Sequence, residues 1–316
     1  MSINLSEYSI LVKSDIEQTA VSLIIFSISF IGCLLNLLAG FTVLKSPVLK
    51  NAFGALCFSH TVANFGVLFV FLVWVAPTTF MQYEHTHLFA GKILGQVTIF
   101  FWNVCAYSHL VISINRFLAI AIPTRAIHLF NYRNTRTIIV IVWLMGFVYV
   151  IPYFFQDTCA ITYDPASWVW VFPDTPCGHA ISTYTDYYSS VIIFVIMSTL
   201  DLCTFTMLIL HHRKSQLTSD NETKRRRRIE IRLFTQSCLQ GVIFFYNEFN
   251  FYYVVTLSSN KWFGFMTSTF AWDLCHCLDG LVVIAFHFKR SLIRKESRPI
   301  IAVSEANSGF RRGRNV

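Results

Sequence analysis

Ionisable side chains are rare in the long apolar segments of this chain, and three of them occur at helical spacing. Asp273, His276 and Asp279 follow one another at intervals of three residues, which lines them roughly along one face of a helix. Such a row suits a hydrogen-bonded switch or a ligand contact. Cys275 and Cys277 also suggest zinc, but adjacent Cys-His-Cys residues project in different directions and lack a second ligand pair at a recognised spacing. We therefore expect no metal site and no cofactor.

A glutamate, Glu248, lies in another apolar segment, about 15 Å by helical rise from its outer end. Phe245, Phe249 and Tyr252 are expected on the same face. A carboxylate at that depth either meets a positive or hydrogen-bond-donating group of a ligand, or is protonated and satisfied by a neighbouring helix, and the sequence leaves both open. The candidate ligand-binding residues are Glu248, Phe249, Tyr252, Asp273 and His276.

Two amides accompany the last of these acids. Asn36, Asn64 and Asp279 are expected to face one another in the inner half of the protein, bridged by water. Polar groups inside a membrane are expensive and are functional candidates by default. Because only one of the three is charged, an internal polar network is favoured over an ion site.

The elements that must position these residues are membrane-spanning helices. Of 316 residues, 54% are apolar and only 13% are charged, against about 25% charged in a soluble domain. Seven stretches have the length of about 20 residues that a helix needs to cross a bilayer. They are residues 20–44, 52–76, 93–115, 137–155, 187–210, 233–257 and 262–286. Because the first four contain no Asp, Glu, Lys or Arg, they predict an all-α bundle of seven transmembrane helices.

Lys and Arg are distributed unevenly between the two ends of this predicted bundle. One side holds 22 of them and the other only three, which places the N-terminus outside and the C-terminus in the cytosol. We therefore expect an extracellular N-terminus over 1–19, a seven-helix domain over 20–288 and a cytosolic tail over 289–316, which begins as a short amphipathic helix. The basic run 224–228 is read as meeting anionic headgroups or a cytosolic partner rather than nucleic acid.

The outer side carries the remaining chemistry. Seven of the nine cysteines lie inside predicted helices, whereas Cys159 and Cys177 both fall in the longest outer segment, 156–186. That segment faces an oxidising compartment, so we expect the two to form a disulfide, which in the chain-entropy picture contributes about 3 kcal/mol. Its aromatic residues fit either a lid over the outer mouth or interfacial anchoring. The Asn4-Leu5-Ser6 sequon predicts glycosylation at Asn4.

At the inner end of the third predicted helix, the string Ser113-Ile114-Asn115-Arg116-Phe117 and the residues up to Pro123 resemble the Asp-Arg-Tyr region of rhodopsin-like G-protein-coupled receptors. The Asn-Arg-Phe version is similar to that of the nematode serpentine receptor class X family. Further marks run along the whole chain: Asn36, Asn64, Trp143, the Cys159 to Cys177 loop, Trp272 and Asp279-Gly280.

The resemblance implies a chemosensory receptor in the plasma membrane, and by extension in a sensory cilium, that binds a small-molecule or peptide ligand and activates a heterotrimeric G protein. In that frame Asn115, Arg116 and Phe117 form the coupling motif, and Glu230 is the expected tether of Arg116 in the resting state. The chain departs from the rhodopsin-like pattern in lacking proline between Pro176 and Pro299.

Rival functions are less well supported by the residues. A retinal Schiff base needs a lysine within the last helix, where none occurs. Asp201 and Asp273 lack the Gly-x-Gly-Asp setting of intramembrane proteases, so no enzyme is expected. A seven-helix ligand-gated channel or transporter is the remaining alternative, but the charge asymmetry and the absence of a visible inverted repeat disfavour both.

Overall fold

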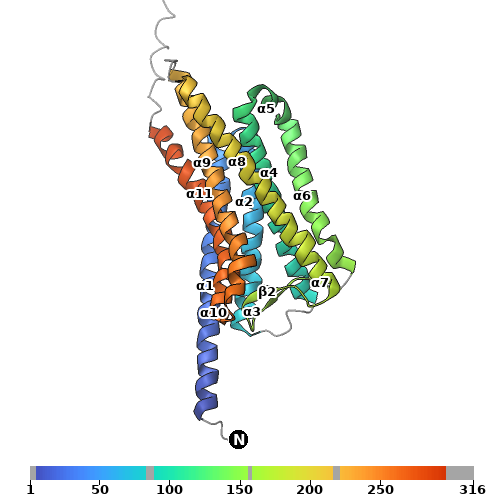
Figure 1. Cartoon of the computed structure of the whole chain (residues 1–316). Coiled ribbons are helices and arrows are strands. Elements are labelled where there is room, and N and C mark those ends of the chain that lie inside the picture. Colours follow the sequence, from blue (N-terminus) through green and yellow to red (C-terminus); the bar gives the residue numbers. More distant parts are fainter. Residues whose placement is uncertain (1–4, 83–88, 156–158, 216–220, 297–316) are drawn as a thin grey trace, which may run out of the picture.

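The computed structural model describes residues 5–82, 89–155, 159–215 and 221–296, which form a bundle of long helices closed at one end by a β-hairpin (Figure 1). In chain order the elements are α1 (Leu5–Lys45), α2 (Ala52–Val70), α3 (Ala76–Phe80), α4 (Phe89–Ala121), α5 (Pro123–Leu129), α6 (Tyr132–Phe155), β1 (Thr162–Asp164), β2 (Val169–Val171), α7 (Pro176–Ala180), α8 (Ser189–Ser215), α9 (Asn221–Phe249), α10 (Lys261–Thr267) and α11 (Thr269–Glu296). The expected all-α bundle is confirmed.

Six helices in the described part of the chain are long and apolar enough to cross a membrane. They cover Asp15–Lys45, Ala52–Phe80, Phe89–Ala121, Tyr132–Phe154, Pro176–Leu210 and Lys261–His287. The seventh long helix, α9, contains the basic run 224–228, which lowers its mean hydropathy. It nevertheless packs in the bundle against α4, α8 and α11.

Two spans are longer than the apolar pattern predicts because a π-turn joins two α-helical segments in each. The second span, expected to end at residue 76, continues through the π-turn Phe71–Val75 into α3 and ends at Phe80. Pro77 has no N–H for the regular ladder, and the wider turn, in which Ala76 donates to the Phe71 carbonyl, accommodates it. In the same way, the π-turn Ile181–Tyr188 joins α7 to α8, so the fifth span begins at Pro176 rather than residue 187.

The first and last long helices of the chain also differ from expectation. Helix α1 begins at Leu5, not at residue 20, and its first turns project beyond the bundle (Figure 1). Neither glycine nor proline occurs between Leu5 and Ile31, so nothing in the sequence interrupts the helix. Likewise α11 runs as one helix to Glu296, where a separate amphipathic helix was expected, because the next proline is Pro299. The sequon residue Asn4 lies outside the described residues.

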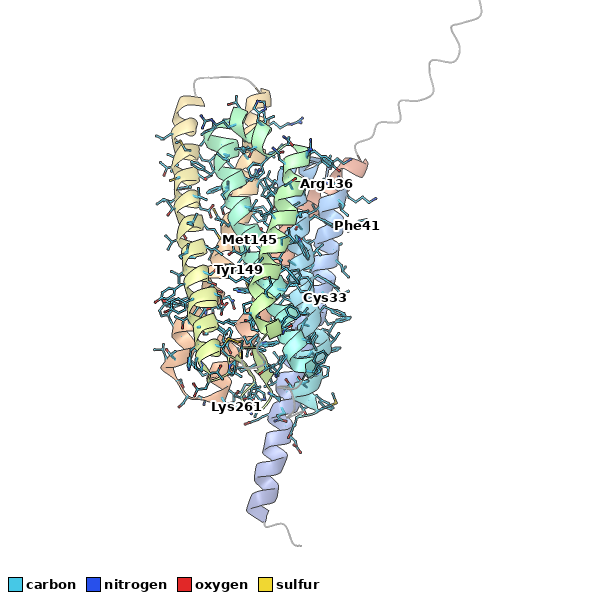
Figure 2. The ribbon with its side chains drawn as sticks, turned by 90° about the vertical axis from the view of Figure 1, so that its right-hand side faces the viewer. Cys33, Phe41, Arg136, Met145, Tyr149 and Lys261 are labelled. Carbon is cyan, nitrogen blue, oxygen red and sulfur yellow. A yellow bond between two sulfur atoms is a disulfide. The ribbon has the colours of Figure 1, made fainter. Side chains whose placement is uncertain are left out.

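Large apolar side chains cover the outside of the bundle. Phe41 is 57% exposed and, as Figure 2 shows, lies at the periphery. Leu37 of the same helix is similarly exposed, as are Val140 of α6, Leu202 of α8 and Val242 of α9. Exposed apolar residues in such numbers are what a lipid-facing surface requires.

Close contact between α1 and α11 depends on a small residue. A Cβ added at Gly280 would lie 2.8 Å from the Asn36 side-chain nitrogen. That nitrogen donates to the His276 carbonyl on α11 at 3.0 Å and to the Gly32 carbonyl at 2.9 Å. The glycine therefore lets a polar side chain of α1 reach the backbone of α11.

The hairpin of β1 and β2 closes one end of the bundle. The strands pair antiparallel with Tyr163 opposite Trp170, and both side chains are buried. Tyr163 shares a 2.8 Å hydrogen bond with the Thr79 hydroxyl, and Trp170 packs on Trp272 of α11 with ring centroids 5.9 Å apart. Of the two interpretations left open by the sequence, a lid over the mouth is the one that this packing supports.

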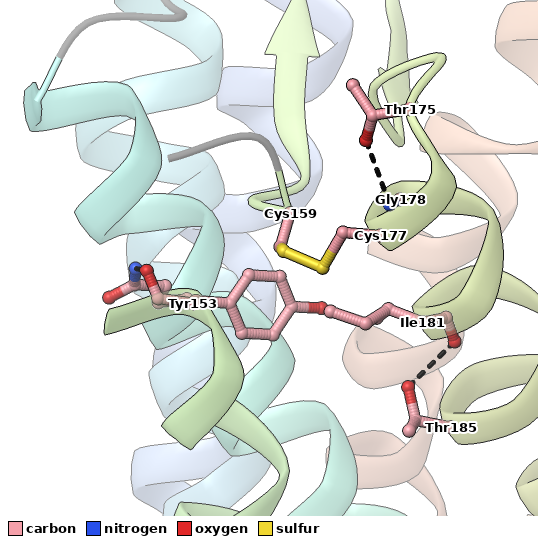
Figure 3. The surroundings of a disulfide bond; sticks show 8 residues. Tyr153, Cys159, Thr175, Cys177, Gly178, Ile181 and Thr185 are labelled. Carbon is pink, nitrogen blue, oxygen red and sulfur yellow. Dashed lines mark hydrogen bonds between the residues drawn. A yellow bond between two sulfur atoms is a disulfide. The ribbon is translucent and has the colours of Figure 1, made fainter. Parts of the chain in front are cut away.

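A disulfide joins Cys159 to Cys177, as expected, and ties the hairpin to α7 (Figure 3). Thr175 caps α7 by accepting a 3.0 Å hydrogen bond from the Gly178 N–H. On the other side of the hairpin, Gly95 of α4 lies so close that a Cβ there would meet the Ile161 carbonyl oxygen at 2.0 Å. The hairpin is thus held covalently to one span and by close packing to another.

Candidate functional sites along the bundle axis

An arginine and a glutamate pair at the basic end of the bundle. Arg116, near the end of α4, donates to Glu230 of α9 at 3.0 Å and to the adjacent Asn115 side chain at 2.6 Å. Its guanidinium also lies over the Phe53 ring of α2, 4.2 Å from the centroid. Arg116 is only 4% exposed, so its charge is held inside the bundle rather than displayed at the surface.

We call this pair, together with Asn115 and Phe53, the coupling rim, after the motif that the sequence resemblance implies. Of the residues expected in it, Asn115, Arg116 and Glu230 come together, whereas Phe117 is half-buried beside them. The ion pair joins α4 to α9, and the contact of the guanidinium with the Phe53 ring adds α2.

A second polar contact between α9 and α11 lies near the rim. Gln236 of α9 and His287 of α11 share a 2.6 Å hydrogen bond, and both are almost fully buried. Sequence reasoning did not single out either residue. It is a further contact that any outward movement of α9 would break.

In the middle of the bundle, His276 connects the core tryptophan to the second span. Its Nε2 accepts from the Trp272 indole at 3.0 Å, and its Nδ1 is 2.6 Å from the Asn64 amide oxygen. A neutral ring with the proton on Nδ1 satisfies both contacts. The row expected from the sequence is therefore only partly continuous, because Asp273 faces away and accepts from Ser29 of α1 at 2.9 Å.

Asp279 lies about one helical turn after His276, further from the hairpin, and contacts side chains of α2 and α4. It accepts from the Asn64 amide at 3.3 Å, and its Oδ2 lies 2.9 Å from His60 Nε2 and 3.5 Å from His109 Nε2. Asn64 and Asp279 thus meet as expected, while the link from Asn36 that the described residues show is a hydrogen bond to the His276 carbonyl. The two histidines had not been predicted here. The spacing of four residues between His60 and Asn64 on one helix is the signal that could have revealed the first.

The half of the bundle next to the hairpin, which the sequence predicts to be the outer half, contains a small cavity of about 20 Å³. It is lined by Ile99, Trp102, Ile161, Asp186, Asn247, Glu248, Phe251, Tyr252 and Trp272. Tyr252 donates to Asp186 at 2.6 Å, and the buried Oε2 of Glu248 has no hydrogen-bond partner among the described residues. Two carboxylates and a ring of aromatic side chains therefore converge on one space, which we call the outer pocket.

Of the expected ligand-binding residues, Glu248 and Tyr252 line the outer pocket and the others do not. Phe249 is 45% exposed and stacks on Tyr253, because a residue one position after Glu248 is turned about 100° around the helix. His276 lies one turn below the pocket, behind Trp272. Asp186 was missed because the fifth span begins earlier than its apolar pattern indicates.

The described residues form a bundle of seven long helices, α1, α2, α4, α6, α8, α9 and α11. The solved structure of squid rhodopsin matches it with a TM-score of 0.72, covering 89% of this chain and 86% of that chain at 16% identity, which shows a shared fold. Melatonin receptor type 1C of Gallus gallus is 27% identical over 177 residues, 55% of this chain and 47% of its own length.

The family follows from the sequence matches. The family described as serpentine type 7TM GPCR chemoreceptor Srx matches residues 26–287. Serpentine receptor class X 45 of Caenorhabditis elegans is 26% identical over 310 residues, covering 93% of this chain and 86% of its own length. Class X-43 of the same organism is 28% identical over 213 residues, 66% of each chain. This chain belongs to the Srx family of serpentine chemoreceptors, which are multi-pass G-protein-coupled receptors of the plasma membrane. The channel or transporter alternative is therefore set aside.

Proposed function

We propose that this receptor binds an extracellular chemical ligand in the outer pocket and activates a heterotrimeric G protein at the coupling rim. The hairpin end then faces outward and the end with Arg116 faces the cytosol. This orientation is supported by charge, because 22 of the 25 Lys and Arg residues fall on the Arg116 side. A sensory cell membrane, and within it the cilium, is the location that fits a chemoreceptor.

The observation that carries the proposal is the buried pair of Arg116 and Glu230 at 3.0 Å. It connects two helices that are separated by more than a hundred residues in the chain, and it lies at the basic end. In this packing Arg116 cannot reach a partner, because its guanidinium is covered by Phe53 and Glu230. Displacement of α9 would break the pair and release the arginine towards a cytosolic protein. The covered arginine supports the assignment of this packing to the resting state.

Contacts between buried side chains run from the outer pocket towards the rim. Trp102 and Trp272 line the pocket and meet edge to face, with centroids 5.5 Å apart. Trp272 donates to His276, His276 contacts Asn64, and Asn64 donates to Asp279. A ligand that favours a different packing of the tryptophans would bias this series of contacts by its differential affinity for the two packings.

The outer pocket in its present volume holds no more than about one water molecule, so the ligand must select a more open packing. Glu248 is the side chain to which we assign ligand contact, because its Oε2 is buried without a partner in the described structure. Polar groups left in this state are costly unless a ligand or a proton satisfies them.

The test is a ligand screen in cells that express the receptor with promiscuous G proteins. Arg116→Ala should abolish the response to any active compound while surface expression persists. Glu248→Gln should shift the potency of that compound without changing basal signalling. Unchanged coupling in Arg116→Ala would remove the rim from the mechanism, and unchanged potency in Glu248→Gln would remove the outer pocket.

Phe249→Ala is the matched control for the pocket variant, since it is the next residue on α9 but faces outward. We expect its potency to equal that of the unmodified receptor. If Phe249→Ala and Glu248→Gln changed potency equally, a general distortion of α9 would explain the result and the pocket assignment would fail.

A further inference from the structure

Three metal-ligating side chains converge at the centre of the bundle. His60 of α2, His109 of α4 and Asp279 of α11 are 1%, 3% and 2% exposed. Both Nε2 atoms point at the same carboxylate oxygen, Oδ2, at 2.9 and 3.5 Å. Within the described residues, this is the group of His, Cys, Asp and Glu side chains whose ligand atoms all lie within 4.8 Å of one another.

Two of the three ligand-atom separations suit a small divalent ion, and the third, between the two imidazole nitrogens, is within 4.8 Å. Zinc binds imidazole nitrogen at about 2.0–2.1 Å and carboxylate oxygen at about 2.0–2.2 Å, so tetrahedral ligand atoms are separated by about 3.3–3.5 Å. The His60 separation of 2.9 Å would open by a few tenths of an ångström, and the His109 separation of 3.5 Å is already suitable. These two contacts could therefore accommodate an ion through side-chain shifts of a few tenths of an ångström.

The electrostatic setting favours a cation. Asp279 Oδ1 is buried and has no hydrogen-bond partner in the described part of the chain. The ion pairs that the described residues form with this carboxylate are with His60 and His109, and none of them is with a lysine or an arginine. A carboxylate in a low-dielectric interior is costly unless a positive charge lies beside it.

The donor set indicates which cation. Two imidazoles and one carboxylate suit zinc and related transition metals, whereas sodium, magnesium and calcium prefer oxygen ligands alone. Asn64 Oδ1 is already engaged by His276 at 2.6 Å and by Cys105 at 3.3 Å, which leaves the fourth position to a water. Three protein ligands and one water form a recognised zinc coordination.

We propose that His60, His109 and Asp279 bind a zinc-class divalent ion that holds α2, α4 and α11 together in the packing in which Arg116 and Glu230 are paired. The site is new relative to the ligand and G-protein sites proposed above, and it does not depend on them. It also revises the expectation, drawn from the sequence, that the protein has no metal site. Sequence spacing could not reveal it because its three ligands come from three different helices.

The binding test uses the purified full-length receptor in lipid nanodiscs, with any affinity tag removed, treated with chelator and titrated with Zn²⁺ alone. We expect one bound zinc per chain and a higher unfolding midpoint in its presence. His60→Gln and His109→Gln should each weaken zinc binding by more than about 100-fold, since loss of a direct ligand exceeds the 10- to 100-fold effect of outer contacts. The midpoint shift should disappear with it.

His179→Gln is the matched control, because His179 and Asp174 form an exposed pair at 2.7 Å on the outer segment. Its zinc affinity should equal that of the unmodified receptor. Co²⁺ bound to the unmodified receptor gives a second readout that needs no variant: a tetrahedral ligand-field spectrum without a thiolate charge-transfer band. Absence of stoichiometric zinc, full affinity in either histidine variant, or a thiolate band, which would assign the ion to Cys105 or another cysteine, would each overturn the proposal.

Discussion

Replacing Glu230 by glutamine should raise signalling in the absence of ligand. The change keeps the size of the side chain and its ability to accept a hydrogen bond, but removes the negative charge that lies 3.0 Å from Arg116. If the pair holds α4 and α9 in the resting packing, its weakening should favour the packing in which Arg116 is released.

The size of the effect follows from the burial of the two partners. Two charges about 4 Å apart interact by about 4 kcal/mol at an effective dielectric constant of about 20. The Glu230 side chain is 32% exposed and Arg116 keeps its other contacts, so solvent screening reduces the net loss to about 1.5 kcal/mol. About 1.4 kcal/mol is a factor of ten in an equilibrium constant. A resting population that is about 1% active should therefore become about 10% active.

The assay is basal G-protein activation in cells, normalised to surface receptor. Glu230→Asp is the control, because it keeps the charge and should give a much smaller rise. The double variant Glu230→Gln with Arg116→Ala should be silent, since the released group is then missing. Basal activity that does not rise in Glu230→Gln, or that rises equally in Glu230→Asp, would refute the assignment of this pair as the resting contact.

Three further changes test the packing. Cys159→Ser, Cys177→Ser and the double variant should lower the free energy of unfolding by the same amount, about 3 kcal/mol, whereas additive losses would mean separate partners. Gly280→Ala should destabilise the receptor by about 1–3 kcal/mol in thermal unfolding, while Gly241→Ala, whose nearest contacts are at 3.9 Å, should not; equal effects would contradict the α1–α11 contact. Burial raises the pKa of Tyr163 above its ordinary value, so stability should fall as the pH rises past about 10, and Tyr163→Phe should lose less of it over that range.

The number and order of the long helices were predictable because the length of each apolar segment can be read directly from the sequence. Their ends were not, because a helix that leaves the hydrocarbon layer continues until a residue stops it. Helix α1 begins fifteen residues before its apolar run for this reason. The second span continues past Pro77 through a π-turn. That turn depends on packing against neighbouring helices, which the periodicity of apolar residues does not report.

The candidate sites were predictable only where a motif or a single helix defines them. Arg116 and Glu230 were paired in advance through the resemblance, and Glu248 and Tyr252 through their spacing of four residues. His109 could not be found in this way, because its partners lie on other helices. Phe249 was misplaced because adjacency in the chain was taken for a shared helical face.

The proposed signalling requires that the coupling rim faces the cytosol and the outer pocket faces the exterior. Different epitope tags on the two ends of the chain, stained in intact and then permeabilised cells, measure this orientation. We expect antibody to reach the N-terminal tag in intact cells and the C-terminal tag only after permeabilisation. The opposite pattern, or both tags accessible on one side, would contradict it.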